Sequence, residues 1–179
     1  TTGDSEADKP IGRLAPMFMK LPKASAMTKA YHKARHIIKH HVNASADDIL
    51  ITDGTGMTGV VNKFQRILGL KVPENLKDFI TIPAEKRPVV FISHMEHHSN
   101  QTSWLETIAD VEVIPATEDG LFSVENLEIL LDKYKERSFK IASITSCSNV
   151  TGIRTPYHEV AKVMHQHKDQ QRDQWSTIL

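Results

Sequence analysis

The sequence predicts an α/β fold in which a mostly parallel β-sheet lies between two layers of helices. Short apolar runs alternate with longer segments whose apolar residues recur at helical spacing. The connections between the apolar runs are long enough to hold a helix, as parallel strands require. Polar clusters also follow three of the apolar runs. Because ligands of open α/β sheets bind at the carboxyl ends of strands, we expect a site there.

The composition of the chain limits the classes of protein to which it can belong. A chain of 179 residues can form one domain with a sizeable core. Lys plus Arg and Asp plus Glu number 22 each, so no excess of positive charge indicates nucleic acid as a partner. No apolar run approaches the roughly 18 residues of a membrane span, so we expect no membrane partner. Cys147 is the single cysteine, which excludes an internal disulfide and favours a reducing, cytoplasmic location.

The first half of the chain is expected to begin with an irregular segment, residues 1–26, because Pro10, Pro16 and Pro22 interrupt any helix. Apolar residues at helical spacing then predict an amphipathic helix over 26–41. The run Ile49–Thr52 predicts a short strand, and apolar residues along one face predict a helix over 57–68.

The second half alternates regularly after a charged, Pro-containing loop over 71–87. Ser123 is expected to cap one helix, and Thr155-Pro156 to open another, with Pro in its favoured first position. The expected strands are 89–93, 111–114 and 140–145, and a further helix is expected over 101–108.

The first polar cluster is the turn Asp53-Gly54-Thr55-Gly56-Met57-Thr58, between a predicted strand and a predicted helix. The unpaired N–H groups and the dipole at a helix start form an anion site, and glycines allow a phosphate close to the backbone. We therefore predict phosphate binding here. A Gly-rich turn with a purely geometric role is the alternative.

Two known phosphate motifs do not apply to this turn. The Gly-Lys-Ser/Thr ending of a Walker loop is missing. Gly54, Gly56 and Gly59 have the spacing of the dinucleotide fingerprint, but that fingerprint needs an acidic residue at the end of a second strand about 20 residues on. The chain there is the loop with prolines, so we reject a dinucleotide site.

The second cluster, Glu96-His97-His98, follows the apolar run Val89–Ile92 and includes a titratable aromatic side chain suited to a ligand site. A metal site formed by His94, His97 and His98 is one alternative. His94 and His98 are four residues apart, but that spacing converges on a metal only along a helix, and here it falls at a strand end. A surface cluster without a function is the other.

The third cluster, Thr145–Gly152, follows the strand predicted over 140–145. The Asn149 amide can donate to a ligand oxygen, or it can stabilise its own turn. Cys147 is a conceivable nucleophile, but a lone Cys among small residues is more often buried and inert.

Read in order, the three clusters resemble the class V aminotransferase and cysteine desulfurase superfamily, over roughly residues 27–167. The matching stretches are Ile49–Thr55, Met95–Asn100 with Trp104, and the Ser-Asn-Val-x-Gly pattern of 148–152. The isopenicillin N epimerase-like branch is similar as well. The fold that this resemblance implies is part of the large domain of a fold-type-I enzyme that uses pyridoxal 5′-phosphate (PLP).

The resemblance also implies roles for individual residues. Thr55, Gly56 and Met57 would hold the cofactor phosphate, His97 would stack on the pyridine ring, and Asn149 would hydrogen-bond the 3-oxygen of the ring. It further implies an amino-acid substrate and a homodimer. We expect residues 27–167 to form the PLP-binding portion.

Two departures from the family pattern limit these expectations. Gly56 stands where the family often has a second Thr, so one hydroxyl donor is lost. The polar run 168–179 does not resemble the strand whose final Asp pairs with the pyridine nitrogen, so neither Asp169 nor Asp173 can be assigned that role. The Schiff-base lysine is not identifiable.

The sequence therefore predicts an enzyme of PLP chemistry that lacks, in this chain, the region of the reactive lysine. Transamination, desulfuration and epimerisation share the parts present here. The alternatives are a non-catalytic α/β module that binds phosphate or PLP, and a His-rich metal-binding domain.

Overall fold

The computed structural model describes residues 22–170 and 175–178. The chain forms two compact units, Thr1–Thr52 and Asp53–Leu179. Of the irregular segment predicted over 1–26, residues 1–21 lie outside the described residues, and residues from Pro22 onward belong to a helix. None of the helices in the described part of the chain has the length and apolar character needed to cross a bilayer.

The first unit contains helix α2 (Pro22–His41), which confirms the helix predicted here. The Nζ of Lys39, in its last turn, donates to the carbonyls of Ala46 at 3.2 Å and Asp48 at 2.7 Å. These bonds hold the following chain against the helix end. The prediction of a strand over Ile49–Thr52 is wrong, because these residues form no strand and Ile49 is 85% exposed.

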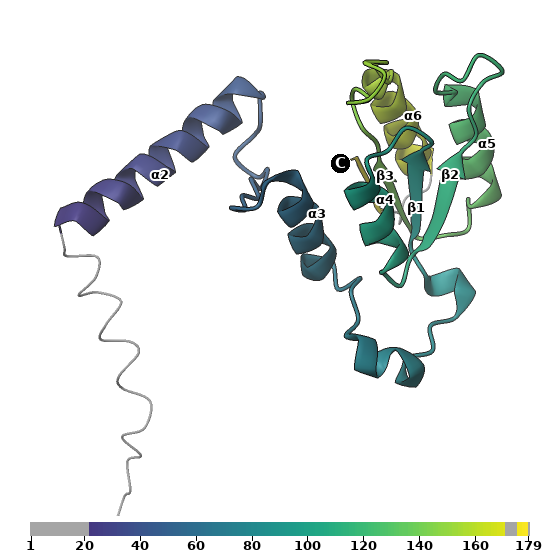
Figure 1. Cartoon of the computed structure of the whole chain (residues 1–179), viewed down its shortest axis with the longest axis horizontal. Coiled ribbons are helices and arrows are strands. Elements are labelled where there is room, and N and C mark those ends of the chain that lie inside the picture. Colours follow the sequence, from purple (N-terminus) through teal and green to yellow (C-terminus); the bar gives the residue numbers. More distant parts are fainter. Residues whose placement is uncertain (1–21, 171–174, 179) are drawn as a thin grey trace, which may run out of the picture. The chain divides into compact units, whose positions relative to one another are not determined.

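The second unit is built on a four-stranded sheet with the order β2-β1-β3-β4, in which each pair of neighbours is parallel (Figure 1). Its elements in chain order are α3 (Gly56–Ile67), η2 (Glu74–Phe79), η3 (Ala84–Lys86), β1 (Val89–Ser93), α4 (His98–Leu105), β2 (Asp110–Ile114), α5 (Val124–Lys133), β3 (Phe139–Ser143), α6 (Tyr157–Gln170) and β4 (Trp175–Ile178).

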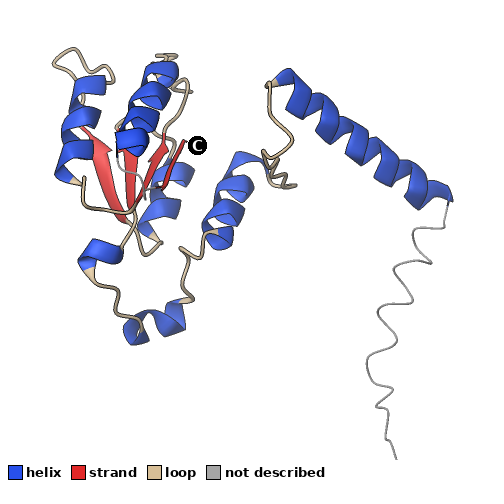
Figure 2. Ribbon diagram, turned by 180° about the vertical axis from the view of Figure 1, so that it is seen from behind, coloured by secondary structure: helices blue, strands red, loops and turns tan. Residues whose placement is uncertain are grey.

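Helices cover both faces of this sheet, which confirms the predicted three-layer α/β fold (Figure 2). Alternate residues of β1 belong to two different cores. Val89 and Phe91 pack with residues of α5 and α6, whereas Val90 and Ile92 pack with residues of α3 and α4. Every residue of β1 is buried, as expected of a parallel strand covered on both faces.

The helix starts follow local capping chemistry. The Ser123 hydroxyl accepts from the Asn126 N–H at 3.0 Å, so the predicted cap of α5 is confirmed. Helix α4 begins three residues earlier than expected. The ring of His97 accepts from the Ser99 N–H at 3.2 Å and so takes the role of the N-cap.

The prediction for residues 168–179 is corrected by the structure. The polar run 168–179 was not expected to contain a strand, but Trp175–Ile178 forms β4 and pairs with β3, Phe139 lying opposite Trp175. Asp169 lies within α6, and Asp173 is outside the described residues. The sheet therefore gains an edge strand that the sequence does not predict, while the strand predicted over 49–52 is absent from it.

The order of the strands creates a reversal at the centre of the sheet. The chain passes from β1 to β2 on one side, then crosses over β1 to reach β3 on the other side. In doubly wound sheets such a reversal opens a crevice at the carboxyl ends of the two diverging strands.

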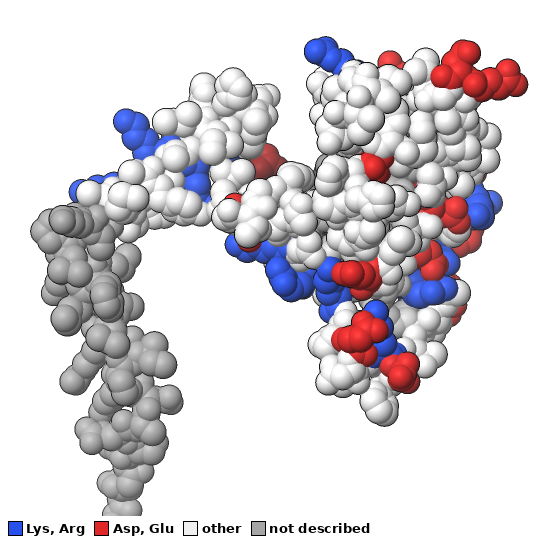
Figure 3. Space-filling view, in the orientation of Figure 1, with Lys and Arg blue, Asp and Glu red and all other residues white. Residues whose placement is uncertain are grey.

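On the outer surface of this unit, basic and acidic side chains are interspersed on the face shown (Figure 3).

Candidate functional site

A cavity of about 610 Å³ lies at the carboxyl ends of β1 and β3, where the strand order reverses. Its walls come from the start of α3, the β1–α4 connection, the end of β3 and the start of α6. The lining residues are Met57, Thr58, Val61, Glu96, His97, Ser99, Asn100, Ser143, Ile144, Thr145, Ser146, Tyr157 and Val160. This volume is in the range of about 300–1,000 Å³ typical of small-molecule sites.

The predicted phosphate turn reaches the cavity through Met57, the second residue of α3. Within the described residues no N-cap side chain bonds the first-turn N–H groups of this helix, and Met57 and Thr58 of that turn line the cavity. Gly56 has a φ of +72°, a backbone conformation that glycine adopts without strain. Thr55 and Gly56 are exposed and are not lining residues.

Thr55 makes its hydrogen bonds within the turn. Its N–H donates to Asp53 Oδ1 at 3.0 Å and its hydroxyl to the same oxygen at 2.6 Å. These two bonds, the hydroxyl first, hold the pKa of Asp53 below its usual value of 3.8. An anion that binds here therefore competes with Asp53 for the donors of Thr55.

Gly59 allows the turn to fold against its own helix. A Cβ at this position would lie 1.9 Å from Thr55 Oγ1 and 2.3 Å from Asp53 Oδ1, far inside contact distance. In the sequence, Gly59 stands out only through its place in the rejected dinucleotide fingerprint. Its spacing from Gly56 is the signal that could have identified it as necessary to the turn.

His97 lines the cavity, whereas His98 is not among the lining residues. The Nδ1 of His97 accepts from the Ser99 N–H and lies 2.8 Å from Ser99 Oγ. Because Nδ1 accepts from a backbone N–H, the neutral ring carries its proton on Nε2. The cap fixes the ring next to the cavity, so Met57 and His97 border one space from two different helices.

Asn149 is exposed and lies in the turn after β3, outside the lining of the cavity. The structure therefore does not bring it together with Met57 and His97. Cys147 was expected to be buried, and this is wrong: the thiol is exposed, with Sγ 3.4 Å from the carbonyl of Gly152. Cys147 does not line the cavity either.

Two lining residues that the sequence analysis did not assign, Glu96 and Asn100, form the most densely hydrogen-bonded part of the site. The Glu96 carboxylate accepts from Ser93 Oγ at 2.5 Å, from the Thr145 N–H at 2.8 Å and from Asn100 Nδ2 at 2.8 Å. These bonds connect the ends of β1 and β3 to α4. Both residues lie inside the stretch Met95–Asn100 that resembles the family motif, but several of their hydrogen-bond partners are distant in the sequence.

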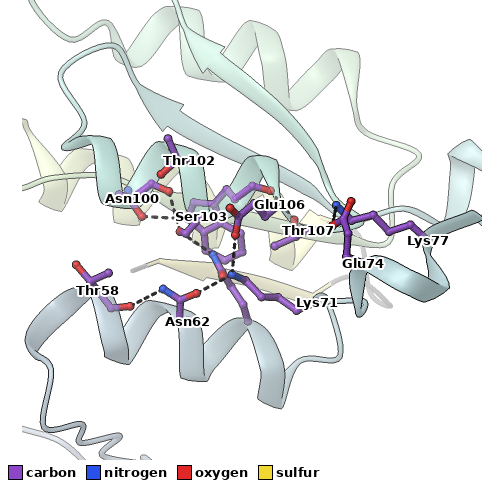
Figure 4. A network of polar contacts seen from close by, with 12 residues as sticks. Thr58, Asn62, Lys71, Glu74, Lys77, Asn100, Thr102, Ser103, Glu106 and Thr107 are labelled. Carbon is purple, nitrogen blue, oxygen red and sulfur yellow. Dashed lines mark hydrogen bonds and ion pairs between the residues drawn. The ribbon is translucent and has the colours of Figure 1, made fainter.

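Polar contacts also join α3 to α4 (Figure 4). Lys71 Nζ donates to Asn62 Oδ1 at 2.6 Å and pairs with Glu106 Oε2 at 3.2 Å, while the Asn62 amide donates to the Thr58 carbonyl at 2.8 Å. Deeper between the helices, buried Gln65 donates to Ser103 Oγ at 3.0 Å. The helix behind the turn is thus fixed to the helix that carries His97.

Among the described residues, the cavity has neither a metal-binding cluster nor a lysine in its lining. In the part of the chain that the structure describes, no three His, Cys, Asp or Glu side chains gather closely enough to hold a metal ion. None of the described lining residues is a lysine. Burial lowers the pKa of Lys140 to about 8, but its Nζ donates to the carbonyls of Lys135 and Arg137, near the amino end of β3.

Comparison with known sequences finds similarity to one family of proteins. A family model described as Aminotransferase class-V matches residues 20–170. The cysteine desulfurase of Synechococcus elongatus is 30% identical over 149 residues, covering 80% of this chain and 21% of that protein. A probable cysteine desulfurase of Halalkalibacterium halodurans is 30% identical over 145 residues, covering 78% of this chain and 32% of that protein. The chain therefore spans only a fifth to a third of the relatives it matches.

Solved structures show the same fold. The cysteine desulfurase CsdA of Escherichia coli matches with a TM-score of 0.57 at 21% identity, over 89% of this chain and 36% of that one. The apo form of mouse CSAD matches with a TM-score of 0.54 at 22% identity, over 82% of this chain and 30% of that one.

Proposed function

The chain belongs to the aminotransferase class V family, and from that premise we propose that it forms the PLP-binding part of an enzyme acting on an amino-acid substrate. The observation that carries the proposal is that Met57 at the start of α3 and His97 at the cap of α4 border one cavity at the reversal of the sheet. A helix start suits a phosphate, and an imidazole suits an aromatic ring.

The residues of the cavity suit such a group. The first turn of α3 supplies backbone N–H groups for the phosphate, and the cap at Ser99 holds the His97 ring for stacking. Bound PLP supplies an electron sink for the carbanion that forms on an amino-acid substrate. The part of this chain is to bind and orient that group in a space of about 610 Å³.

Three features shape the proposal. Thr55 reaches the phosphate only by exchanging its bonds to Asp53. Asn149, proposed to bond the 3-oxygen of the ring, acts from the turn that follows the lining residue Ser146. Because no described lining residue is a lysine, this chain is expected to hold PLP without a covalent bond.

The activity of the longer protein belongs to the same proposal. Its curated relatives are cysteine desulfurases, so desulfuration of an amino acid is the reaction we put first, with transamination and epimerisation as its competitors. We propose a homodimer, which the family resemblance implies. We also propose a cytoplasmic location, which the single cysteine favours.

Binding of three related compounds to the 179-residue chain tests the proposal. PLP and pyridoxine 5′-phosphate, which lacks the aldehyde, should bind with similar Kd values, because the phosphate and ring contacts suffice. Pyridoxal, which lacks the phosphate, should bind at least tenfold more weakly. Equilibrium dialysis measures all three. Equal binding of pyridoxal and PLP would overturn the role of the α3 turn.

Substitutions separate the residues of the site. His97→Ala should weaken PLP binding about tenfold, in line with the loss of one aromatic stacking contact. His98→Ala is the matched control, since His98 neighbours His97 without lining the cavity. Asn149→Ala should have a smaller effect than His97→Ala. Reduction with borohydride followed by peptide mapping should yield no single labelled lysine, and one stoichiometric labelled lysine would contradict the non-covalent proposal.

A further inference from the structure

The carboxylate of Glu96 stands at the centre of a group of hydrogen bonds that joins three elements. Its Oε1 accepts both the Ser93 hydroxyl of β1 and the backbone N–H of Thr145, just after β3. Its Oε2 accepts the amide of Asn100 in α4. Because Oε1 receives two donors, only an oxygen can occupy that position.

Asn100 is equally constrained. Its Nδ2 donates to Glu96 Oε2 and, at 3.3 Å, to the Ser143 carbonyl. Its Oδ1 accepts from Ser143 Oγ at 2.9 Å and from Trp104 Nε1 at 3.1 Å. Both ends of the amide are therefore engaged, and rotating it would place a donor against a donor at one end and an acceptor against an acceptor at the other.

His97 lies between these two residues in the sequence. Its carbonyl accepts from the N–H groups of Asn100 at 2.9 Å and Gln101 at 3.2 Å, so its backbone belongs to the same first turn of α4. The residue before it is fixed by β1 and β3, and the residue three positions after it is fixed by β3 and Trp104. The His97 ring thus projects from a backbone segment held at both ends.

We propose that Glu96 and Asn100 are positioning residues that set the orientation of His97 at the cavity, acting through complementary carboxylate and amide groups. This inference rests on the proposed function, in which His97 stacks on the PLP ring. It assigns to the pair no contact with the reacting atoms. It also explains why an acidic and an amide side chain are needed at these positions, since each has a fixed donor or acceptor opposite it.

Exchanging the two chemical groups tests the proposal. In Glu96→Gln, the amide nitrogen must take the place of Oε2, since Oε1 receives two donors, and it then meets the donor of Asn100. In Asn100→Asp, a carboxylate oxygen meets Glu96 Oε2 and the Ser143 carbonyl. The double variant restores a donor opposite an acceptor and keeps the net charge, but it retains the unfavourable contact with the Ser143 carbonyl.

Each variant of the full 179-residue chain is examined by three measurements. The Kd for PLP is measured by dialysis, and the induced circular dichroism of bound PLP, per mole bound, reports the orientation of the ring against His97. Amide hydrogen exchange of Thr145 reports the Glu96 bond without any ligand. Glu128→Gln, an exposed site on α5, is the matched control.

We expect Glu96→Gln to weaken PLP binding about tenfold, to alter the induced signal and to speed exchange of the Thr145 amide, a size typical of one lost charged hydrogen bond. Asn100→Asp should be more severe. The double variant should bind PLP more tightly than Asn100→Asp does, which independent losses cannot produce. If the double variant does not fold, the Glu96→Gln measurements decide alone.

Other outcomes are distinguishable. Additive losses in the double variant, or a wild-type induced signal in Glu96→Gln, would overturn the positioning role. Loss of stability with an unchanged signal per bound PLP would show that the pair only supports the fold, which also overturns it. Failure of the wild-type chain to bind PLP would refute the proposed function instead, and the Thr145 exchange rates would still show whether Glu96 holds the strand end.

Discussion

The two motifs that border the cavity are built in opposite ways. The β1–α4 motif is cross-linked: Glu96 and Asn100 bond side chains and backbone from β1, β3 and α4. The turn before α3 is local: Asp53 and Thr55 bond each other, two residues apart, and both are exposed. Each motif borders the cavity, yet only the first is anchored by distant parts of the chain.

The difference separates two ways in which a polar motif can serve a site. In the β1–α4 motif the side chains of Glu96 and Asn100 line the cavity but are hydrogen-bonded to the scaffold, and His97 lines the cavity beside them. In the turn, the backbone at the start of α3 is what the motif offers, and its side chains have to change partners to assist. We therefore expect substitutions of the cross-linked residues in the first motif to change stability as well as ligand binding, and substitutions in the second to change mainly ligand binding.

The largest effect is expected for Asn100→Ala. It leaves the Glu96 carboxylate, the Ser143 hydroxyl and the Trp104 indole each short of a partner in half-buried or buried surroundings. Unfolding in denaturant should show a loss of about 3 kcal/mol. Thr102→Ala on the same helix removes only a bond to the His98 carbonyl and is the control. A comparable loss for Asp53→Ala in the turn would abolish the distinction between the two motifs.

Gly59→Ala should act on the turn alone. The new methyl group would collide with the side chains of Thr55 and Asp53, which must rotate away, while the helix itself gains from alanine. We expect PLP binding to weaken about tenfold, or ~1.4 kcal/mol, with no loss of thermal stability. Gly54→Ala is a matched control, because a Cβ at Gly54 meets nothing within 4 Å. Equal effects of the two substitutions would remove the turn geometry from the site.

Gln65→Leu tests the contact between the two helices that carry the motifs. Gln65 is fully buried, and its Oε1 has no partner among the described residues. Leucine loses one bond to Ser103 but removes that unsatisfied oxygen and replaces a buried amide by an apolar group. Because an unsatisfied buried acceptor costs about 1–3 kcal/mol and the lost bond about 1 kcal/mol, the variant should be more stable by about 1 kcal/mol. A lower melting temperature would show that the bond matters more than the orphaned oxygen.

The smallest effect concerns Asp53 and pH. The Thr55 hydroxyl and N–H lower the pKa of Asp53 below 3.8 in the folded chain. The contribution of this contact to stability is therefore present above about pH 3.8 and is lost as the pH falls through the lower, folded value. Titration followed by NMR should show a midpoint below 3.8 for Asp53, and Thr55→Val should raise it. A midpoint at or above 3.8 in the wild-type chain would mean that the turn opens in solution.

Most helices and strands of the second unit could be predicted from the sequence, because their patterns are local. The apolar run Val89–Ser93 predicts β1 with its observed bounds, and Ser123 predicts the cap of α5. Prediction from the sequence fails where the formation of a strand depends on a partner strand. Ile49–Thr52 has the composition of a strand, but a strand forms only where another pairs with it. Trp175–Ile178 follows a polar run, yet β3 provides an edge for it.

The site was predictable to the same extent. That His97 and Met57 line the cavity could be expected from their places, His97 after an apolar strand and Met57 at the start of a helix. The hydrogen bonds of Glu96 and Asn100 could not be predicted. Glu96 bonds Thr145, which is 49 residues away, and Asn100 bonds Ser143, which is 43 residues away. A hydrogen bond over that separation leaves no pattern in the sequence, whereas a cap or a turn does. That Asp53 occupies the donors of Thr55 depends on side-chain rotation, which sequence spacing does not encode.

The bond from Glu96 to Thr145 also orders events during folding. It closes a loop of 49 residues that contains α4, β2, α5 and β3. The entropy of closing such a loop must be overcome before the bond can form, so contacts of this kind develop late. During synthesis, β1 and the residues around His97 leave the ribosome well before β3. The cavity therefore cannot take shape until Thr145 has docked, and a ligand that recognises the cavity would stabilise only chains that have completed this step.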